Sequence, residues 1–305
     1  MKRYVWLVLG VLLFLTLGGV AAPAGPAAGA TPGQAEFSAP GPYGTTTMSV
    51  TDGSGARYEV FAPRHYGALG FRSPIVTWGN GTDAVPTMYS TLLGHFASYG
   101  LTVIASDLTN TGSGRDMYAA VRYLIHANAT AGNAFTGHLD VHAVAAVGHS
   151  QGATGAVRVA SMDPKVVRSL MTFSLPDAMW SHTNPDCPVV TDCEQDTALV
   201  TQPSFLISTH GPIDKIIAGP SDERAYFDGL RGHATLGIIA VTGGRAADHN
   251  SVQDARYGGR SVGELGYATA WLEYTLRGNR TAAHAFVGAH PEILANGAWP
   301  GSAVK

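Results

Sequence analysis

Charged residues and cysteines are both scarce in this sequence. Of 305 residues, 13% are charged and the formal net charge is −3, whereas about 25% charged residues is usual for a soluble domain. No basic cluster follows Arg3, and this argues against nucleic acid as the main partner. The low charge suits a secreted protein with many Gly, Ser, Thr and Asn side chains on its surface.

Metal-binding motifs are also missing. The only cysteines are Cys187 and Cys193, in CPVVTDC, so a zinc site built from two cysteine pairs is excluded. The chain has no H-E-x-x-H motif, and His138 and His142 have a single acidic neighbour, Asp140, between them. We interpret these histidines as loop residues and expect neither a metal nor an organic cofactor. In an oxidising compartment the two cysteines would form a disulfide that clasps a small loop; two free thiols are the alternative.

The N-terminal segment has the pattern of a secretory signal. Lys2 and Arg3 precede an uncharged apolar run, VWLVLGVLLFLTL, and the following GGVAAPAGPAAGA ends in small residues. A charged start, an apolar centre and an A-x-A-like end are typical of a signal peptide, so we predict that residues 1–30 are removed after Ala30. An uncleaved membrane anchor is the alternative, but the interrupting Pro and Gly residues favour cleavage. We therefore expect a secreted protein without a stable membrane anchor.

Beyond residue 30 the pattern predicts a short linker and one domain. Residues 31–42 are rich in Pro, Gly and Ala, which indicates a linker. From 43 to 305, short β-branched runs alternate with helical patterns, and no internal repeat is evident. Such alternation is typical of a mostly parallel sheet with helices on both faces. The expected strands are 74–78, 101–106, 144–149, 166–174, 203–209 and 234–241, and the expected helices are 85–100, 114–128, 151–162, 222–230 and 261–277.

One serine lies between two glycines at the junction of a predicted strand and helix. The segment Gly148-His149-Ser150-Gln151-Gly152 follows an apolar strand and opens a helix of small residues. This is the context of a nucleophile elbow, in which the serine is strained and the glycines let strand and helix pass closely. The helix N-terminus adds backbone N–H groups beside the hydroxyl. We predict Ser150 as a nucleophile rather than an ordinary turn serine, and His149 as a structural residue whose ring points away from it.

A serine nucleophile needs a base, and the base needs a carboxylate that orients it. In this arrangement the chain order is Ser, Asp or Glu, then His, on loops that follow later strands. Asp214 and His249 each follow a predicted late strand, so both fall at the carboxyl edge of the sheet. We predict Asp214 as the acid and His249 as the base. Asp177 is the alternative acid, and His210 and His233 are alternative bases whose positions fit the pattern less well.

Backbone N–H groups are needed where negative charge develops on a substrate. One donor is expected to be the N–H of Gln151, directly after the nucleophile. The other is expected to be the N–H of Asn80 in the loop GNGTD, because Gly79 and Gly81 let that backbone approach a substrate closely. An ordinary glycine turn is the alternative for this loop.

Five segments together carry a resemblance to a known family. They are PIVTWGNGT, HFASYGLTVIASDLTNTGSG, VAAVGHSQGATGAVRVAS, FLISTHGPIDKIIAG and ATAWLEYTLRGN. With them the chain resembles, from about residue 42 to 300, the secreted bacterial cutinases and polyester hydrolases of the α/β-hydrolase superfamily, which include enzymes acting on polyethylene terephthalate. The resemblance implies an α/β-hydrolase fold in a single domain. It also implies a triad of Ser150, Asp214 and His249, with oxyanion donors at Asn80 and Gln151.

Three positions depart from that family. Asn80 stands where polyester hydrolases usually have an aromatic residue, Gln151 where they usually have methionine, and Asp177 where they have tryptophan after a proline. In the family these apolar groups would stack on an aromatic diacid. Trp180 either supplies a ring in their place or packs against the protein. We expect Asp177 and Trp180 to border the substrate, and the segment 177–200 to form a rim over the site.

The expected function is hydrolysis of carboxylic esters through an acyl-enzyme on Ser150. Amide hydrolysis by the same groups is a second hypothesis, because leaving-group preference depends on the shape of the pocket. A secreted binding module that kept the fold without activity is a third, and the complete set of Ser, Asp and His in the right order counts against it. We expect a monomer whose partner is an ester or polyester substrate.

Overall fold

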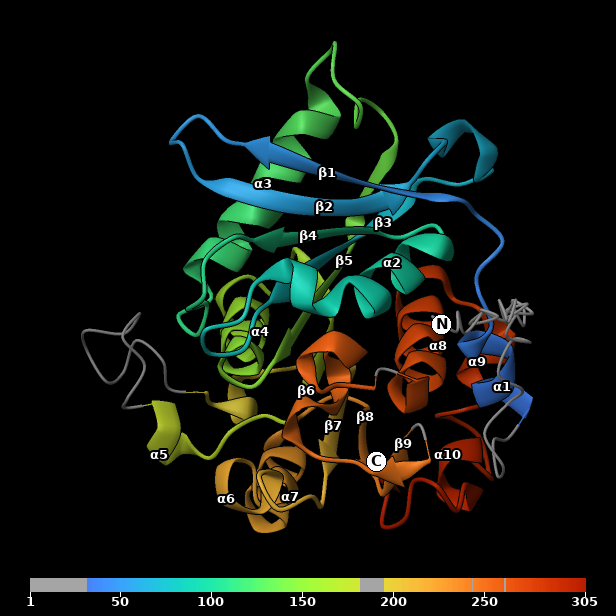
Figure 1. Cartoon of the computed structure of the whole chain (residues 1–305). Helices are drawn as coiled ribbons and strands as arrows, with labels where there is room; N and C mark the ends of the chain where they lie inside the picture. Colours follow the sequence, from blue (N-terminus) through green and yellow to red (C-terminus); the bar gives the residue numbers. More distant parts are fainter. Residues whose placement is uncertain (1–31, 182–194, 243, 261) are drawn as a thin grey trace, which may run out of the picture.

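The computed structural model describes residues 32–181, 195–242, 244–260 and 262–305. Its centre is a nine-stranded sheet in the order β1-β2-β4-β3-β5-β6-β7-β8-β11, with helices on both faces (Figure 1). A separate two-stranded ribbon pairs β9 with β10. The strands are β1 Thr45–Thr51, β2 Arg57–Pro63, β3 Ser73–Gly79, β4 Thr102–Ser106, β5 Leu139–His149, β6 Val167–Phe173, β7 Ser204–Thr209, β8 Ala234–Ile239, β9 Val241–Thr242, β10 Arg245–Ala246 and β11 Ala303–Val304.

The middle of the sheet is parallel. Strands β4, β3, β5, β6, β7 and β8 run in one direction, and β2 and β11 flank them in antiparallel pairing. Every residue of β3, β4, β7 and β8 is buried, as expected for parallel strands that are covered on both faces. The prediction of an α/β protein with a mostly parallel sheet is confirmed, and the predicted strands and helices are present with boundaries shifted by a few residues.

The helices divide between the two faces of the sheet. One apolar core contains side chains of α1, α2, α8 and α10, and the other contains side chains of α3, α4 and α7. The α-helices are α1 Pro32–Ser38, α2 Ser90–Ser98, α3 Arg115–Ala129, α4 Gln151–Met162, α5 Ala178–Ser181, α6 Asp214–Ile217, α7 Pro220–Gly229, α8 Val262–Arg277, α9 Arg280–Ala283 and α10 Glu292–Ala295. Short 3-10 helices are Tyr66–Ala68, Pro86–Tyr89, Thr197–Leu199, His249–Val252 and Ala255–Tyr257.

The expected linker at residues 31–42 is wrong for most of its length, because α1 is a packed helix. It lies beside α8 and α9 (Figure 1), with Phe37 buried in the core. The Glu292 carboxylate accepts hydrogen bonds from the N–H groups of Gly33 at 2.9 Å and Gln34 at 3.0 Å, so it caps the first turn. The composition was misleading because α1 owes its stability to this tertiary contact rather than to helix propensity.

Candidate active site

Ser150 lies on a sharp turn between β5 and α4. Its backbone angles are φ 53° and ψ −127°, in a region that costs a non-glycine residue about 1–3 kcal/mol. A Cβ on Gly148 would collide with the Gly152 carbonyl group, and a Cβ on Gly152 would collide with the backbone of Gly79 and Asn80. Both glycines are therefore required by close backbone approach, which is the packing that the motif predicted.

Three side chains from separate loops form one hydrogen-bonded chain. Ser150 Oγ lies 3.0 Å from His249 Nε2, and His249 Nδ1 lies 2.7 Å from Asp214 Oδ1. Ser150 and His249 are 8% and 7% exposed, and Asp214 is fully buried. An ionised carboxylate only accepts hydrogen bonds, so it places the imidazole proton on Nδ1 and leaves Nε2 free to accept the serine proton. The structure brings together the three residues that the sequence singled out.

The second oxygen of the candidate acid is also held. Asp214 Oδ2 accepts hydrogen bonds from Ser174 Oγ at 2.9 Å, from the Thr209 N–H at 3.1 Å and from the Thr209 hydroxyl. These donors leave Oδ1 directed at His249. Behind them, Glu223 of α7 is fully buried, and burial together with the nearby Asp214 charge raises the pKa of Glu223 well above its ordinary value. Neither Ser174 nor Thr209 was evident from the sequence, because each is one polar residue at a strand end among many.

His149 does not act on the nucleophile beside it but links two loops. Its Nε2 lies 2.9 Å from the carbonyl oxygen of His249, and its Nδ1 lies 2.9 Å from the Tyr89 hydroxyl. The carbonyl only accepts, so Nε2 carries the proton and Tyr89 donates to Nδ1, while the Tyr89 oxygen accepts from the Gly81 N–H at 3.1 Å. Burial and the neighbouring His249 lower the pKa of His149 well below its ordinary value. The ring is therefore neutral and structural, as predicted.

The side chain of Asn80 is turned inward. It is fully buried, and its Nδ2 donates to the carbonyl oxygens of Ser106 at 2.8 Å and Leu108 at 2.9 Å. Its backbone lies against Gly152 at the first turn of α4. Asn80 therefore secures the loop after β4 instead of offering a polar group to a substrate, and the oxyanion role of its N–H stays a prediction.

Gln151 holds the same loop further along. Its Oε1 accepts from the Gly112 N–H at 3.0 Å, and its Nε2 donates to the Thr109 carbonyl at 2.8 Å. With Asn80 it ties the segment from Ser106 to Gly112 to the elbow. The side chains at positions 80 and 151 are thus both amides that donate to backbone carbonyl groups of this loop. The oxyanion role of the Gln151 N–H also stays a prediction.

The other sequence candidates lie apart from the triad hydrogen bonds. Asp177 accepts from the Met179 N–H at 3.0 Å, and α5 places the half-exposed Trp180 with its Nε1 3.3 Å from the Ile216 carbonyl. His233 binds the Lys305 carbonyl at 3.0 Å and stacks on Trp271, and no hydrogen bond among the described residues joins Asp177 or His233 to the triad. Asp214, rather than Asp177, is therefore the acid partner of His249. Cys187 and Cys193 fall outside the described residues.

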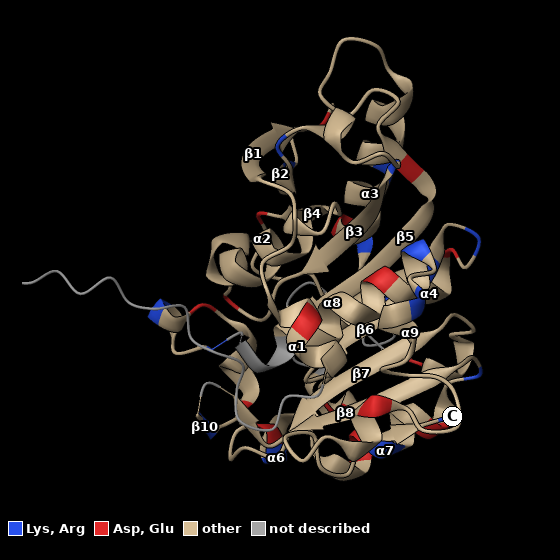
Figure 2. Ribbon diagram, turned by 90° about the vertical axis from the view of Figure 1, so that its right-hand side faces the viewer, with Lys and Arg blue, Asp and Glu red and all other residues tan. Residues whose placement is uncertain are grey.

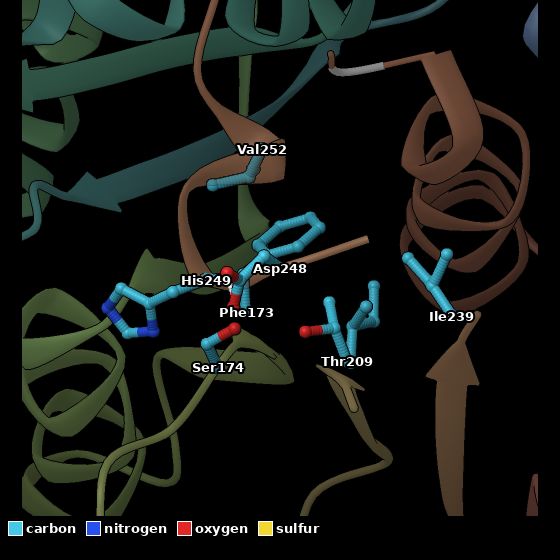
Figure 3. A pocket seen from close by; sticks show the side chains of 8 residues that line it. Phe173, Ser174, Thr209, Ile239, Asp248, His249 and Val252 are labelled. Atoms are coloured by element: carbon cyan, nitrogen blue, oxygen red, sulfur yellow. Dashed lines mark hydrogen bonds between the residues drawn. The ribbon is translucent and has the colours of Figure 1, made fainter. Parts of the chain in front are cut away.

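Several exposed apolar side chains lie on segments that follow strands of the parallel sheet, as the three residues of the candidate triad do. Exposed Leu108, Met179, Ile213 and Ile216 project from the loops after β4, β6 and β7. A small pocket has His249 in its wall, and Figure 3 shows Ser174, Thr209, Asp248 and His249 as its polar members. It is lined by Phe173, Ser174, Ile207, Thr209, Ile239, Asp248, His249 and Val252. A ligand at this edge of the sheet would meet both the Ser150–His249–Asp214 hydrogen bonds and exposed apolar side chains.

Charge is thinly spread over the described part of the chain. In Figure 2 the Lys, Arg, Asp and Glu positions are scattered singly over several elements, and no face in that view gathers one sign. Among the described residues, no group of three or more His, Cys, Asp or Glu side chains could hold a metal ion. Within the same residues, no helix has both the length and the apolar character to cross a membrane.

Comparison with known proteins adds no relative. A scan against protein-family models gave no match, and a search of curated proteins gave none either. Function is therefore inferred from the residues of this chain and the way they are brought together.

Proposed function

We propose that this chain is a secreted serine hydrolase of the α/β-hydrolase fold that cleaves carboxylic esters. The observation that carries the proposal is the hydrogen-bonded chain from Ser150 through His249 to the buried Asp214. It stands on a strained elbow at the carboxyl edge of a parallel sheet, where the sites of such folds are built. A scaffold turn would not need a positive φ at a serine and a base aligned on its hydroxyl.

In the proposed reaction Ser150 Oγ attacks the ester carbonyl carbon, and its proton passes to His249 Nε2. The resulting imidazolium is stabilised by the Asp214 carboxylate at Nδ1. His249 then gives the proton to the leaving alcohol as the C–O bond breaks, which leaves an acyl group on Ser150. A water molecule gives a proton to the same histidine and attacks the acyl carbon; the bond to Ser150 Oγ breaks, His249 returns the proton to Oγ, and the acid is released. The N–H groups of Asn80 and Gln151 are the proposed donors to the oxyanion.

The border of the site favours an apolar substrate. Leu108, Met179, Trp180, Ile213 and Ile216 are exposed large apolar side chains on the segments that follow β4, β6 and β7. The side-chain amides of Asn80 and Gln151 both donate to the loop after β4. Neither residue supplies an aromatic ring like the one that polyester hydrolases, which this chain resembles, place on an aromatic diacid. We therefore place aliphatic esters and polyesters ahead of aromatic ones as substrates.

The proposal is tested by hydrolysis of p-nitrophenyl butyrate by the chain that begins at Thr31. Ser150→Ala should lower kcat by several orders of magnitude. Ser161→Ala is the matched control, because Ser161 lies on the same helix α4 and donates to the Arg158 carbonyl; it should leave kcat unchanged. Equal activity of the Ser150→Ala variant and the parent would refute the role of Ser150. Turnover of the matching amide at a comparable rate would favour amide hydrolysis instead.

A further inference from the structure

Asp248 directly precedes His249, and one oxygen of its carboxylate faces the backbone of both loops that carry the acid and the base. Asp248 Oδ1 accepts the N–H of His249 at 2.9 Å, the N–H of Ile213 at 3.0 Å and the N–H of Asp214 at 3.2 Å. Asp214 and His249 are 35 residues apart in the chain. A single charged acceptor therefore ties their two backbones together, and hydrogen bonds to an ionised acceptor are stronger than neutral ones.

The surrounding loops are shaped to admit this carboxylate. The Asp248 N–H donates to Ser251 Oγ at 2.9 Å, which completes a capping box at the 3-10 helix His249–Val252. On the opposite loop, a Cβ on Gly211 would collide with the Asp248 carboxylate and with the Ala247 carbonyl. The loop that leads to Asp214 thus has a glycine at the position that packs against the Asp248 carboxylate.

His249 is held on both sides of its Cα. Its N–H donates to Asp248, and its carbonyl oxygen accepts from His149 Nε2 at 2.9 Å. With both flanking peptide groups fixed, the imidazole reaches Asp214 and Ser150 by side-chain rotation alone. A misplacement of about 1 Å in such a group can cost about a hundredfold in rate.

We propose that Asp248 is a positioning residue for the triad, which acts through the backbones of Asp214 and His249 without touching the substrate. The proposal rests on the proposed function in that His249 serves as the base. It assigns to Asp248 a role in the rate of the chemical steps and not only in the stability of the loop.

Two variants at this position and one matched control test the proposal. Asp248→Ala should lower kcat for p-nitrophenyl butyrate about 10- to 100-fold, with KM within about threefold of the parent. Asp248→Asn keeps an oxygen that can accept the same N–H groups, and it should recover most of the loss. Asp52→Ala removes a carboxylate that likewise accepts two backbone N–H groups, from Ser54 at 2.8 Å and Ala56 at 3.0 Å, in the β1–β2 turn. This control should lower Tm and leave kcat unchanged.

A double variant separates positioning from a general loss of structure. In the His249→Ala background the base is absent, so Asp248→Ala should not lower the residual rate further. A full additional loss in that background would overturn the proposal. So would an Asp248→Ala protein that loses Tm as Asp52→Ala does but keeps the parent's kcat.

A readout without substrate distinguishes failure of this proposal from failure of the proposed function. The proton shared by His249 Nδ1 and Asp214 should give a low-field proton NMR resonance in the parent and in Asp248→Asn, and the resonance should disappear in Asp248→Ala. If the parent shows it without hydrolysing esters and Asp248→Ala loses it, the function fails and the positioning of His249 against Asp214 stands. If the parent hydrolyses esters and Asp248→Ala retains both the resonance and kcat, the positioning role fails.

Discussion

Replacing Asp214 with asparagine changes the charge of the buried acid while keeping its shape. In the parent, Oδ2 accepts from Ser174 Oγ, from the Thr209 N–H and from the Thr209 hydroxyl. An asparagine should place its amide oxygen there, because an NH₂ group in that position would face the Thr209 N–H, which can only donate. Its NH₂ group would then face His249 Nδ1 and donate to it.

This reversal puts the imidazole proton on Nε2. The protonated Nε2 faces the Ser150 hydroxyl and cannot accept the serine proton. The wrong tautomer in a triad costs about 10⁴-fold in kcat, or about 5 kcal/mol of transition-state stabilisation. Tm should change little, because the side chain keeps its volume and its contacts. The assay is hydrolysis of p-nitrophenyl butyrate, with Asp196→Asn as the control. Asp196 caps the 3-10 helix Thr197–Leu199, so this variant should retain the parent's kcat. An Asp214→Asn protein within tenfold of the parent would refute the reasoning.

Three further predictions follow from buried groups near the site. Burial raises the pKa of Glu223 above the ordinary 4.5. As pH rises above about 4.5, the unfolded state therefore releases a proton that the folded state keeps, and the folded state loses stability. Glu223→Gln should therefore be more stable than the parent by an amount that grows with pH in denaturant titrations; an equal pH dependence of the two proteins would contradict this. Tyr89→Phe removes the hydroxyl that joins the Gly81 N–H to His149. It should lower kcat about tenfold and the free energy of unfolding by about 1–3 kcal/mol. An unchanged kcat would show that this hydrogen-bonded link has no part in the reaction. Gly152→Ala places a Cβ against the backbone of Gly79 and Asn80, and it should abolish activity and lower Tm, whereas Gly94→Ala, where a Cβ would meet nothing, should do neither.

The sequence was most informative where short-range pattern and chemistry coincide. The glycines around Ser150 predict a strained turn, and the strand order predicts which loops carry Asp214 and His249. These residues meet because the carboxyl ends of parallel strands share one edge of the sheet, a property that local patterns already determine.

Features that depend on distant contacts could not be predicted in the same way. The roles of the Asn80 and Gln151 side chains became evident only once the loop after β4 was placed beside the elbow. Strand β11 consists of two residues, and its pairing with β8 defines it. Asp248 was visible beside His249 in the sequence, but its hydrogen bond to the Asp214 N–H requires two loops to meet.

The central claim is that Ser150 is a nucleophile activated by His249. A fluorophosphonate probe forms a covalent bond with an activated serine and needs no knowledge of the natural substrate. Incubation of the parent, Ser150→Ala and His249→Ala with this probe, followed by peptide mass spectrometry, measures the modification directly. We predict one adduct on the peptide that contains Ser150 in the parent, none in Ser150→Ala, and much slower labelling in His249→Ala. An unlabelled parent, or equal labelling of Ser150→Ala, would contradict the account.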